Sequence, residues 1–240
     1  MQDGKPALDY THRALDRGWH VVSANKGPFV VDFDGIRKKA AKNRLSLGMS
    51  GATAAALPTL DVALRSLAGT EIYRIEGILN GTSNYILTRM DEGLEYPDAM
   101  KEAQGSGIAE PDPSQDVEGW DTAAKLLIIT NAVFKTAYSL RDIHVEGITG
   151  IPLDRMKKAK EMNKKIKLMG RCTSDNDEIK IETRLSLIDR SHPLYGIDGA
   201  QKGITFYTDT MDSITVTGGK SDPRGAAAAL LKDIINIYRD

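Results

Sequence analysis

The chain opens on a single helix–strand–turn unit, and this feature restricts its possible folds more than any other. Residues 6–18 carry Leu8 and Leu15 at helical spacing and end at a glycine, and residues 20–24 form a short β-branched run. The polar turn at 25–28 follows, as is typical after a buried parallel strand. One such unit cannot bury both faces of a parallel sheet. We therefore expect preceding sequence, or another chain, to complete the sheet.

Further along the chain, helical and strand patterns first alternate, and the strand patterns then cluster. The predicted helices are residues 34–44, 57–67, 85–90, 96–104, 118–136, 152–163 and 223–238, and the predicted strands are residues 45–49, 71–79, 165–172, 178–188, 203–209 and 213–218. This order is typical of an α/β chain with an appended mixed sheet that helices cover.

Composition and charge exclude several classes of protein. The 240 residues include 32 basic and 33 acidic side chains, and the net charge of -1 gives no electrostatic basis for binding nucleic acid or an anionic membrane. Cys172 is the single cysteine, so no internal disulfide can form, and the four histidines do not lie at metal-ligand spacing with it. The sequence has no apolar run of membrane-spanning length, and its polar start does not resemble a secretory signal. We expect a cytoplasmic protein without a histidine–cysteine metal centre.

Residues 105–125 contain the side chains best suited to chemistry. Asp121 and Lys125 are four residues apart in a predicted helix and therefore share one face. An aspartate beside a lysine at the start of a strongly apolar helix would position a general acid–base group. The same spacing also describes an ordinary surface ion pair, and spacing alone favours that interpretation.

Acidic side chains gather just before that helix, in a loop that contains two prolines. Glu110, Asp112, Asp116 and Glu118 could stabilise the N-terminus of the helix, with Asp116 as its N-cap. The loop could instead hold the ammonium group of a substrate, or a divalent metal ion, although no histidine is nearby. Composition alone favours capping.

Two other turns stand where proteins of this class bind ligands. Asn25 and Lys26 follow the carboxyl end of the N-terminal strand, and open α/β sheets bind ligands at that edge. Asn80, Gly81 and Thr82 open a helix whose backbone N–H groups could bind a carboxylate or phosphate. A polar turn and an ordinary helix cap explain these two segments at least as well when each is taken alone.

Taken together, these segments resemble the homoserine dehydrogenase family. The resemblance rests on the order and spacing of VSANK at 22–26, GILNGTSNYILT at 77–88, EPDP at 110–113, and Asp116, Gly119, Asp121 and Lys125 after them. The segments 166–170, 192–194 and 232–234 are also similar, so that the resemblance covers nearly the whole chain.

By that resemblance, the chain catalyses reversible hydride transfer between NAD(P)H and aspartate 4-semialdehyde, which gives L-homoserine for threonine and methionine biosynthesis. The resemblance implies that Lys125 donates a proton to the carbonyl oxygen, that Asp121 orients Lys125 and the substrate, and that Lys26 lies between nicotinamide and substrate. Glu110 would bind the substrate ammonium, with Asp116 in support. The substrate pocket would be lined by Asn80, Gly81 and Thr82, and the cofactor would be contacted by Ser23, Asn25 and Lys26.

Three departures from the family pattern limit what the resemblance implies. The sequence contains no G-x-G-x-x-G fingerprint after a predicted strand, so it favours neither NAD nor NADP. Ser50 stands where family members carry a glutamate in a turn that holds a monovalent cation, so backbone carbonyls alone would have to bind such an ion here. Near the C-terminus, residues 220–222 and Ala226 differ from the family residues that approach the cofactor.

The resemblance also implies how the chain is organised. Residues 1–60 would be the C-terminal part of a Rossmann-like nucleotide domain, and residues 61–220 an α+β catalytic and dimerisation domain with a mixed sheet covered by helices. Residues 221–240 would form a helix that returns to the nucleotide domain. The expected partners are the amino-acid substrate and a second copy of the chain, as a homodimer. Two alternatives stay open: a catalytically incomplete binding module of the same fold, and another semialdehyde reductase.

Overall fold

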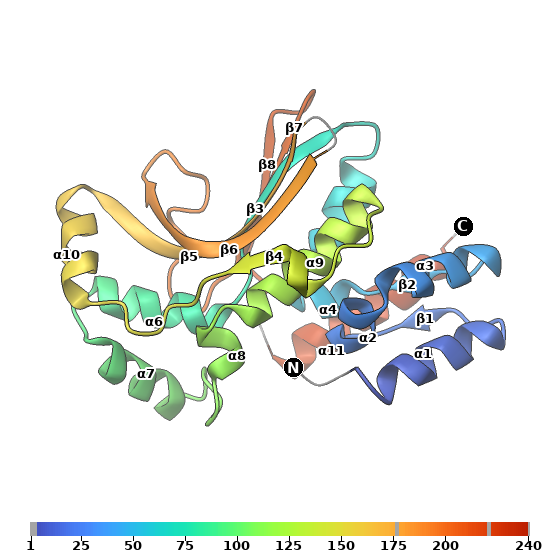
Figure 1. Cartoon of the computed structure of the whole chain (residues 1–240), viewed down its shortest axis with the longest axis horizontal. Helices are drawn as coiled ribbons and strands as arrows, with labels where there is room; N and C mark the ends of the chain where they lie inside the picture. The colour runs from blue at the N-terminus through green and yellow to red at the C-terminus, as the bar shows by residue number, and fades with distance from the viewer. Residues whose placement is uncertain (1–3, 176–177, 220–221, 240) are drawn as a thin grey trace. The chain divides into compact units, whose positions relative to one another are not determined.

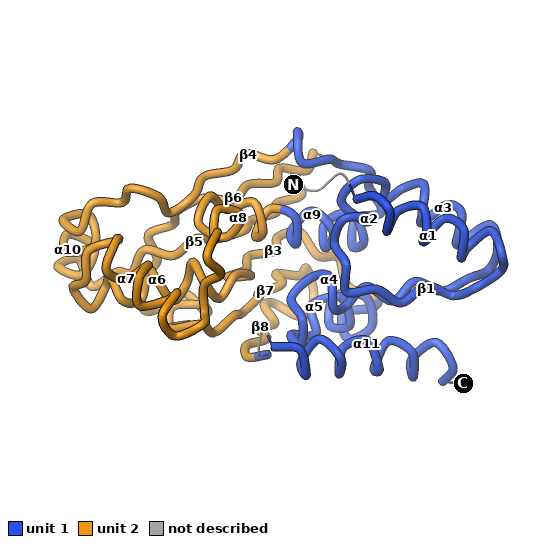
Figure 2. The backbone as a smooth tube through the Cα atoms, turned by 90° about the horizontal axis from the view of Figure 1, so that it is seen from below, with its two compact units in different colours: residues 1–68, 124–142, 219–240 blue, residues 69–123, 143–218 orange. Residues whose placement is uncertain are grey.

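The chain forms two compact units (Figure 2). The computed structural model describes residues 4–175, 178–219 and 222–239. Unit 1 consists of residues 1–68, 124–142 and 219–240, and unit 2 consists of residues 69–123 and 143–218. The division predicted from the sequence differs mainly in residues 124–142, which group with the N-terminal part. The boundary predicted between residues 220 and 221 lies outside the described residues.

Unit 1 surrounds a two-stranded parallel sheet with helices. Its strands are β1 (Val21–Val22) and β2 (Leu47–Gly48), and its helices are α1 (Ala7–Asp16), α2 (Lys26–Val31), α3 (Phe33–Lys42), α4 (Ser50–Ala54), α5 (Thr59–Asp61), a π-helical turn (Val62–Ser66), most of α9 (Trp120–Phe134), a 3₁₀ turn (Leu140–Asp142) and α11 (Pro223–Ile237). Its core contains Leu15, Phe29, Ile36 and Ile128, which solvent hardly reaches. These residues come from α1, α2, α3 and α9, so that helices far apart in sequence share one core.

A buried polar cluster fastens α11 to the rest of unit 1. Ser50, the first residue of α4, donates from its backbone nitrogen and its Oγ to the Asp233 carboxylate, at 2.9 and 2.7 Å. Lys232 donates to Ser50 Oγ at 2.8 Å and forms an ion pair with Asp61. Ser50 and Asp233 are 5% and 6% exposed, so these bonds satisfy polar groups that water hardly reaches.

Unit 2 is built on a six-stranded mixed sheet in the order β4-β6-β5-β3-β7-β8. The strands are β3 (Ile72–Ile78), β4 (Ile143–Val145), β5 (Lys164–Asp175), β6 (Glu178–Asp189), β7 (Gly203–Thr208) and β8 (Ser213–Thr217). β4 runs parallel to β6, and the other neighbouring strands pair antiparallel. The hairpin of β5 and β6 stays in register along its length, from the pair of Lys164 and Asp189 to the pair of Asp175 and Glu178.

Helices cover one face of this sheet (Figure 1). They are α6 (Gly81–Asp91), α7 (Tyr96–Gly105) and α10 (Leu153–Glu161), with the short α8 (Ser114–Val117) beside α6. Leu87 of α6 and Met156 of α10 pack in one cluster with Leu168 of β5. Met169 belongs to a second cluster with Leu194. Because neighbouring residues of a strand point to opposite faces, the segment after β6 covers the other side of β5.

The α/β fold class and most predicted elements are confirmed, with differences at their boundaries. The helix predicted over residues 57–67 begins after Pro58, at Thr59, and α5 continues without a break into the π-helical turn. The helix predicted over residues 118–136 is α9, and the separate short helix α8, which was not predicted, precedes it. No helix in the described part of the chain is long and apolar enough to cross a membrane.

Candidate functional site

The side chain of Asn80 begins α6 and forms the centre of the candidate site in unit 2. Asn80 is the N-cap of α6, and its Oδ1 accepts a hydrogen bond from the backbone nitrogen of Ser83 at 2.8 Å. That bond satisfies one of the four N–H groups that a helix N-terminus leaves without an intrahelical acceptor. The cap predicted at this turn is therefore present.

The amide nitrogen of the same side chain bridges two aspartates. Asn80 Nδ2 donates to Asp116 Oδ1 at 2.6 Å and to Asp121 Oδ2 at 2.8 Å. One amide thus uses both of its hydrogens to hold two carboxylates from later in the chain. Asn80 and Asp121 are only 5% and 8% exposed, so these hydrogen bonds are largely shielded from water. The structure thereby brings together three of the residues that the sequence indicated separately.

A glycine allows the two aspartates to meet at Asn80. Asp116 lies in α8 and Asp121 in the first turn of α9, and Gly119 between the two helices has a φ of 88°. A Cβ at Gly119 would lie 2.5 Å from the carbonyl oxygen of Glu146, which no side chain could tolerate. The sequence predicted Asp116 as the N-cap of the helix that is α9, and this prediction is wrong. Asp116 lies inside α8, whose N-cap position is Pro113.

The loop between α7 and α8 carries Glu110, another predicted substrate residue. Thr82 donates from Oγ1 to the carbonyl oxygen of Ile108 at 3.0 Å, and so ties the start of α6 to this loop. Glu110 follows two residues later with an exposed side chain. An exposed carboxylate is available to a ligand that carries an ammonium group. The role of Glu110 in binding a substrate stays a prediction.

The predicted cofactor residues lie together after β1 in unit 1. Ser23 Oγ accepts from the backbone nitrogen of Asn25 at 3.0 Å, and Asn25 Oδ1 accepts from that of Gly27 at 2.8 Å. Asn25 is thus the N-cap of α2, and Lys26 is its first residue, half-buried. The polar turn predicted after the strand is a capped helix start at the carboxyl end of a parallel strand.

Lys125 lies in α9, one turn after Asp121, and is half-buried. Because residues four apart share one face of a helix, Lys125 lies on the same face of α9 as Asp121, as the sequence predicted. The four residues that follow Lys125 are inaccessible to solvent. No three histidine, cysteine, aspartate or glutamate side chains among the described residues form a group that could hold a metal ion.

Sequence reasoning missed a second polar network, next to the start of α6. Lys167 of β5 is 1% exposed and donates to Asn84 Oδ1, three residues after Gly81. Burial lowers the pKa of Lys167, while its ion pair with Asp198 acts in the opposite direction. A lysine within the apolar run from Ile166 to Met169 was a visible signal, because lysine is almost never fully buried unless it is paired.

Comparison with known proteins relates this architecture to one family. The family model for homoserine dehydrogenase matches residues 58–235. The chain is 36% identical over 238 residues to the NAD(+)-dependent homoserine dehydrogenase of Pseudomonas canavaninivorans, and 37% identical over 239 residues to the homoserine dehydrogenase of Methanocaldococcus jannaschii. Both alignments cover 99% of this chain, which spans 68% and 70% of the two relatives. The solved structure of a putative homoserine dehydrogenase from Archaeoglobus fulgidus matches with a TM-score of 0.90 at 40% identity, over 96% of this chain and 71% of that one.

Proposed function

Because the chain belongs to the homoserine dehydrogenase family, we propose that it is the substrate-binding and catalytic part of an enzyme that interconverts L-homoserine and L-aspartate 4-semialdehyde with a nicotinamide dinucleotide. The observation that carries this proposal is the bridge from Asn80 to Asp116 and Asp121. It prearranges two carboxylates beside the backbone N–H groups of a helix start. Such a site offers acceptors for an ammonium group and donors for a carboxylate, the two charged groups of an amino-acid substrate.

Each predicted side chain has one role in this reaction. Lys125 gives a proton to the carbonyl oxygen of the semialdehyde as that oxygen gains negative charge, and takes the proton back in the reverse direction. Asp121 orients Lys125 from the preceding turn of α9. Glu110 binds the substrate ammonium, and Asp116 supports it. Gly81 and Thr82 line the pocket together with Asn80, whose capping bond fixes the start of α6.

The residues present fit one end of a dinucleotide. Ser23, Asn25 and Lys26 follow the carboxyl end of the parallel strand β1, and α/β sheets bind ligands at that edge. Bound NAD(P)H would supply the hydride for reduction of the semialdehyde, and NAD(P) would accept it from homoserine. Lys26 would lie between nicotinamide and substrate, where its ammonium would stabilise the oxygen. The relative from Pseudomonas canavaninivorans is named as NAD(+)-dependent, which supports NAD as the first cofactor to test.

The experiment that tests the function is oxidation of L-homoserine by the purified chain, with NAD and NADP in parallel, followed by absorbance of the reduced cofactor. Turnover that is lost with 4-hydroxybutyrate, which lacks the ammonium group, would support an amino-acid dehydrogenase that reads its substrate through Glu110. Equal turnover of both compounds would favour another semialdehyde reductase.

If the chain folds but shows no turnover, a further experiment distinguishes an incomplete catalytic part from a binding module. The chain spans about two thirds of the two relatives, so activity that returns when an upstream dinucleotide-binding segment is added would identify a catalytic part that needs this segment. Binding of L-homoserine without turnover, both with and without the added segment, would identify a binding module. A homodimer and a cytoplasmic location stay predictions, which sedimentation and cell fractionation would test.

A further inference from the structure

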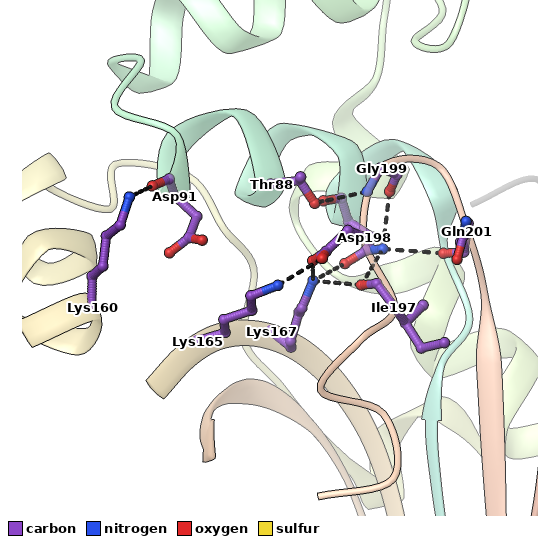
Figure 3. A network of polar contacts seen from close by, with 10 residues as sticks. Thr88, Asp91, Lys160, Lys165, Lys167, Ile197, Asp198, Gly199 and Gln201 are labelled. Atoms are coloured by element: carbon purple, nitrogen blue, oxygen red, sulfur yellow. Dashed lines mark hydrogen bonds and ion pairs between the residues drawn. The ribbon is translucent and has the colours of Figure 1, made fainter. Parts of the chain in front are cut away.

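Lys167 is buried in unit 2 with all three hydrogens of its ammonium group used. Nζ donates to Asn84 Oδ1 at 3.0 Å, to the carbonyl oxygen of Ile197 at 2.5 Å and to Asp198 Oδ1 at 3.0 Å (Figure 3). Placing a charged group in the interior costs free energy unless every hydrogen finds a partner. A lysine kept at such a place therefore fixes its acceptors in one arrangement.

The acceptors of Lys167 connect α6 with residues 197–201, here called the 197–201 loop. Asn84 Nδ2 shares its two hydrogens among the carbonyl oxygens of Ile197, Gly199 and Gln201, at 3.1, 2.9 and 3.1 Å. One turn later in α6, Thr88 Oγ1 accepts from the backbone nitrogen of Gly199 at 2.9 Å. Asn84 is thus held by Lys167 through its oxygen and holds the loop through its nitrogen. The loop lies along α6, as Figure 3 shows at Thr88 and Gly199.

This loop reaches the candidate substrate pocket at Gly81. A Cβ at Gly81 would lie 2.8 Å from the carbonyl oxygen of Ala200, which is closer than side chains tolerate. The loop therefore abuts the backbone between Asn80 and Thr82. Lys167 acts on that backbone by two routes, through Asn84 in the same helix and through Ala200 in the loop.

We propose that Lys167 is a positioning residue for the substrate: by fixing the 197–201 loop to Asn84, it holds Gly81 and the bridging side chain of Asn80 where L-homoserine binds. This inference rests on the proposed function. Lys167 itself touches no reacting atom in this scheme. A shift of the backbone at Gly81 would move the amide of Asn80, and with it both aspartates that this amide holds.

Two neighbouring lysines give a matched pair of variants. Lys165 lies two residues before Lys167 in β5 and binds the same carboxylate, with Nζ 2.6 Å from Asp198 Oδ2. It is partly exposed, whereas the Lys167 side chain is 2% exposed. In Lys167→Met, Lys165 still neutralises Asp198, and the methionine fills the volume of the lysine stem. The variant should therefore fold, and the Lys165→Met control removes the same charge without disturbing Asn84.

The test is isothermal titration of L-homoserine into the full chain, with and without NAD, for the unaltered protein and both variants. We expect Lys167→Met to raise the dissociation constant roughly tenfold or more, with the number of sites per chain unchanged, and Lys165→Met to stay within about twofold. A merely structural role would reduce the number of sites and leave the dissociation constant of the folded fraction as it was.

The other possible results would overturn either the role of Lys167 or the proposed function. An unchanged dissociation constant in Lys167→Met, or an equal rise in both variants, would overturn the role of Lys167 and leave the proposed function intact. No binding by the unaltered chain would overturn the proposed function, and this inference with it. If Lys167→Met does not show the circular dichroism of the unaltered protein, Thr88→Val takes its place. That variant removes the hydroxyl that accepts from the backbone nitrogen of Gly199 and donates to the carbonyl oxygen of Asn84. An unchanged dissociation constant in it would likewise overturn the inference.

Discussion

Replacement of Glu76 by glutamine should remove a large part of the acid sensitivity of unit 2. Glu76 lies in the middle of β3 and is 2% exposed. Arg171 Nε lies 2.7 Å from its Oε1, and its Oε2 accepts from His192 Nε2 at 3.0 Å and from Tyr207 at 2.9 Å. The other ring nitrogen of His192 accepts from the backbone of Leu194, so the tautomer with a hydrogen on Nε2 satisfies both contacts.

The magnitude follows from the pKa of this carboxyl. Burial by itself would raise the pKa of Glu76, but the hydrogen bond from His192 and the charge of Arg171, with further help from Tyr207 and Arg74, hold it at about 2 instead of 4.5. That difference corresponds to about 3 kcal/mol of folding free energy. The folded-state pKa is the lower one, so this stability is complete above about pH 5 and is lost as the pH falls toward 2. Roughly half of it should remain near pH 3.

The assay is urea unfolding at several pH values, observed by one tryptophan. The chain has two tryptophans, of which Trp120 lies in unit 2 and Trp19, exposed, in unit 1. In a Trp19→Phe background, fluorescence reports on unit 2 alone. We expect Glu76→Gln to lower the free energy of unfolding by about 3 kcal/mol near pH 7 and by roughly half of that near pH 3. The exposed Glu161→Gln controls for the loss of one negative charge.

The result that would refute this reasoning is a constant difference between the unaltered protein and Glu76→Gln across the whole range of pH. Such a result would mean that the carboxylate charge of Glu76 contributes no more than the polar shape that glutamine reproduces. A loss of equal size in Glu161→Gln would point to net charge as the cause.

Four other predictions concern the site and unit 1. Lys125→Met should lower turnover by about 10²–10⁴-fold while circular dichroism stays the same, and near-normal turnover would exclude the proton-transfer role. Glu110→Gln should raise the KM for L-homoserine roughly tenfold with little change in kcat, and an unchanged KM would argue against ammonium binding. Asn80→Ser keeps a capping oxygen but loses the bridging amide, so calorimetry should show homoserine binding about tenfold weaker; equal affinity would mean that the bridge is not used. Asp233→Ala removes the carboxylate that accepts from the backbone nitrogen and from Oγ of Ser50. It should lower the free energy of unfolding by about 2 kcal/mol in urea titrations, and a change within error would leave the cluster without a stabilising role.

Local sequence patterns were sufficient to predict most of the secondary structure. Most strands of unit 2 were predictable because they are short segments rich in β-branched and apolar residues with turn residues at their ends, as in 165–172 and 203–209. Helix starts were harder to place. Pro58 and Gly119 were visible in the sequence, yet the apolar pattern after them favoured helices from residues 57 and 118, whereas the helices begin at Thr59 and Trp120. β4 was missed because three residues are too few to establish a period.

Contacts between distant segments could not be predicted from one sequence. The pairing of Glu76 with His192 spans 116 positions, and that of Lys167 with Asn84 spans 83. No local spacing encodes either, because His192 reaches Glu76 from the segment after β6, and Asn84 reaches Lys167 from a helix that packs on β5. The family resemblance placed Asn80, Asp116 and Asp121 in one pocket, but it did not indicate which side chain connects them.

The structure also resolves a choice that the sequence posed at Asn80. A helix cap and a ligand-binding turn stood as competing explanations for the segment from Asn80 to Thr82. They are compatible, because an asparagine amide has an acceptor and a two-hydrogen donor at opposite ends. The oxygen caps α6, and the nitrogen holds Asp116 and Asp121. A serine or aspartate would cap this helix about as well, but neither could donate to two carboxylates at once. The choice of asparagine among the good capping residues is therefore explained by the site rather than by the helix.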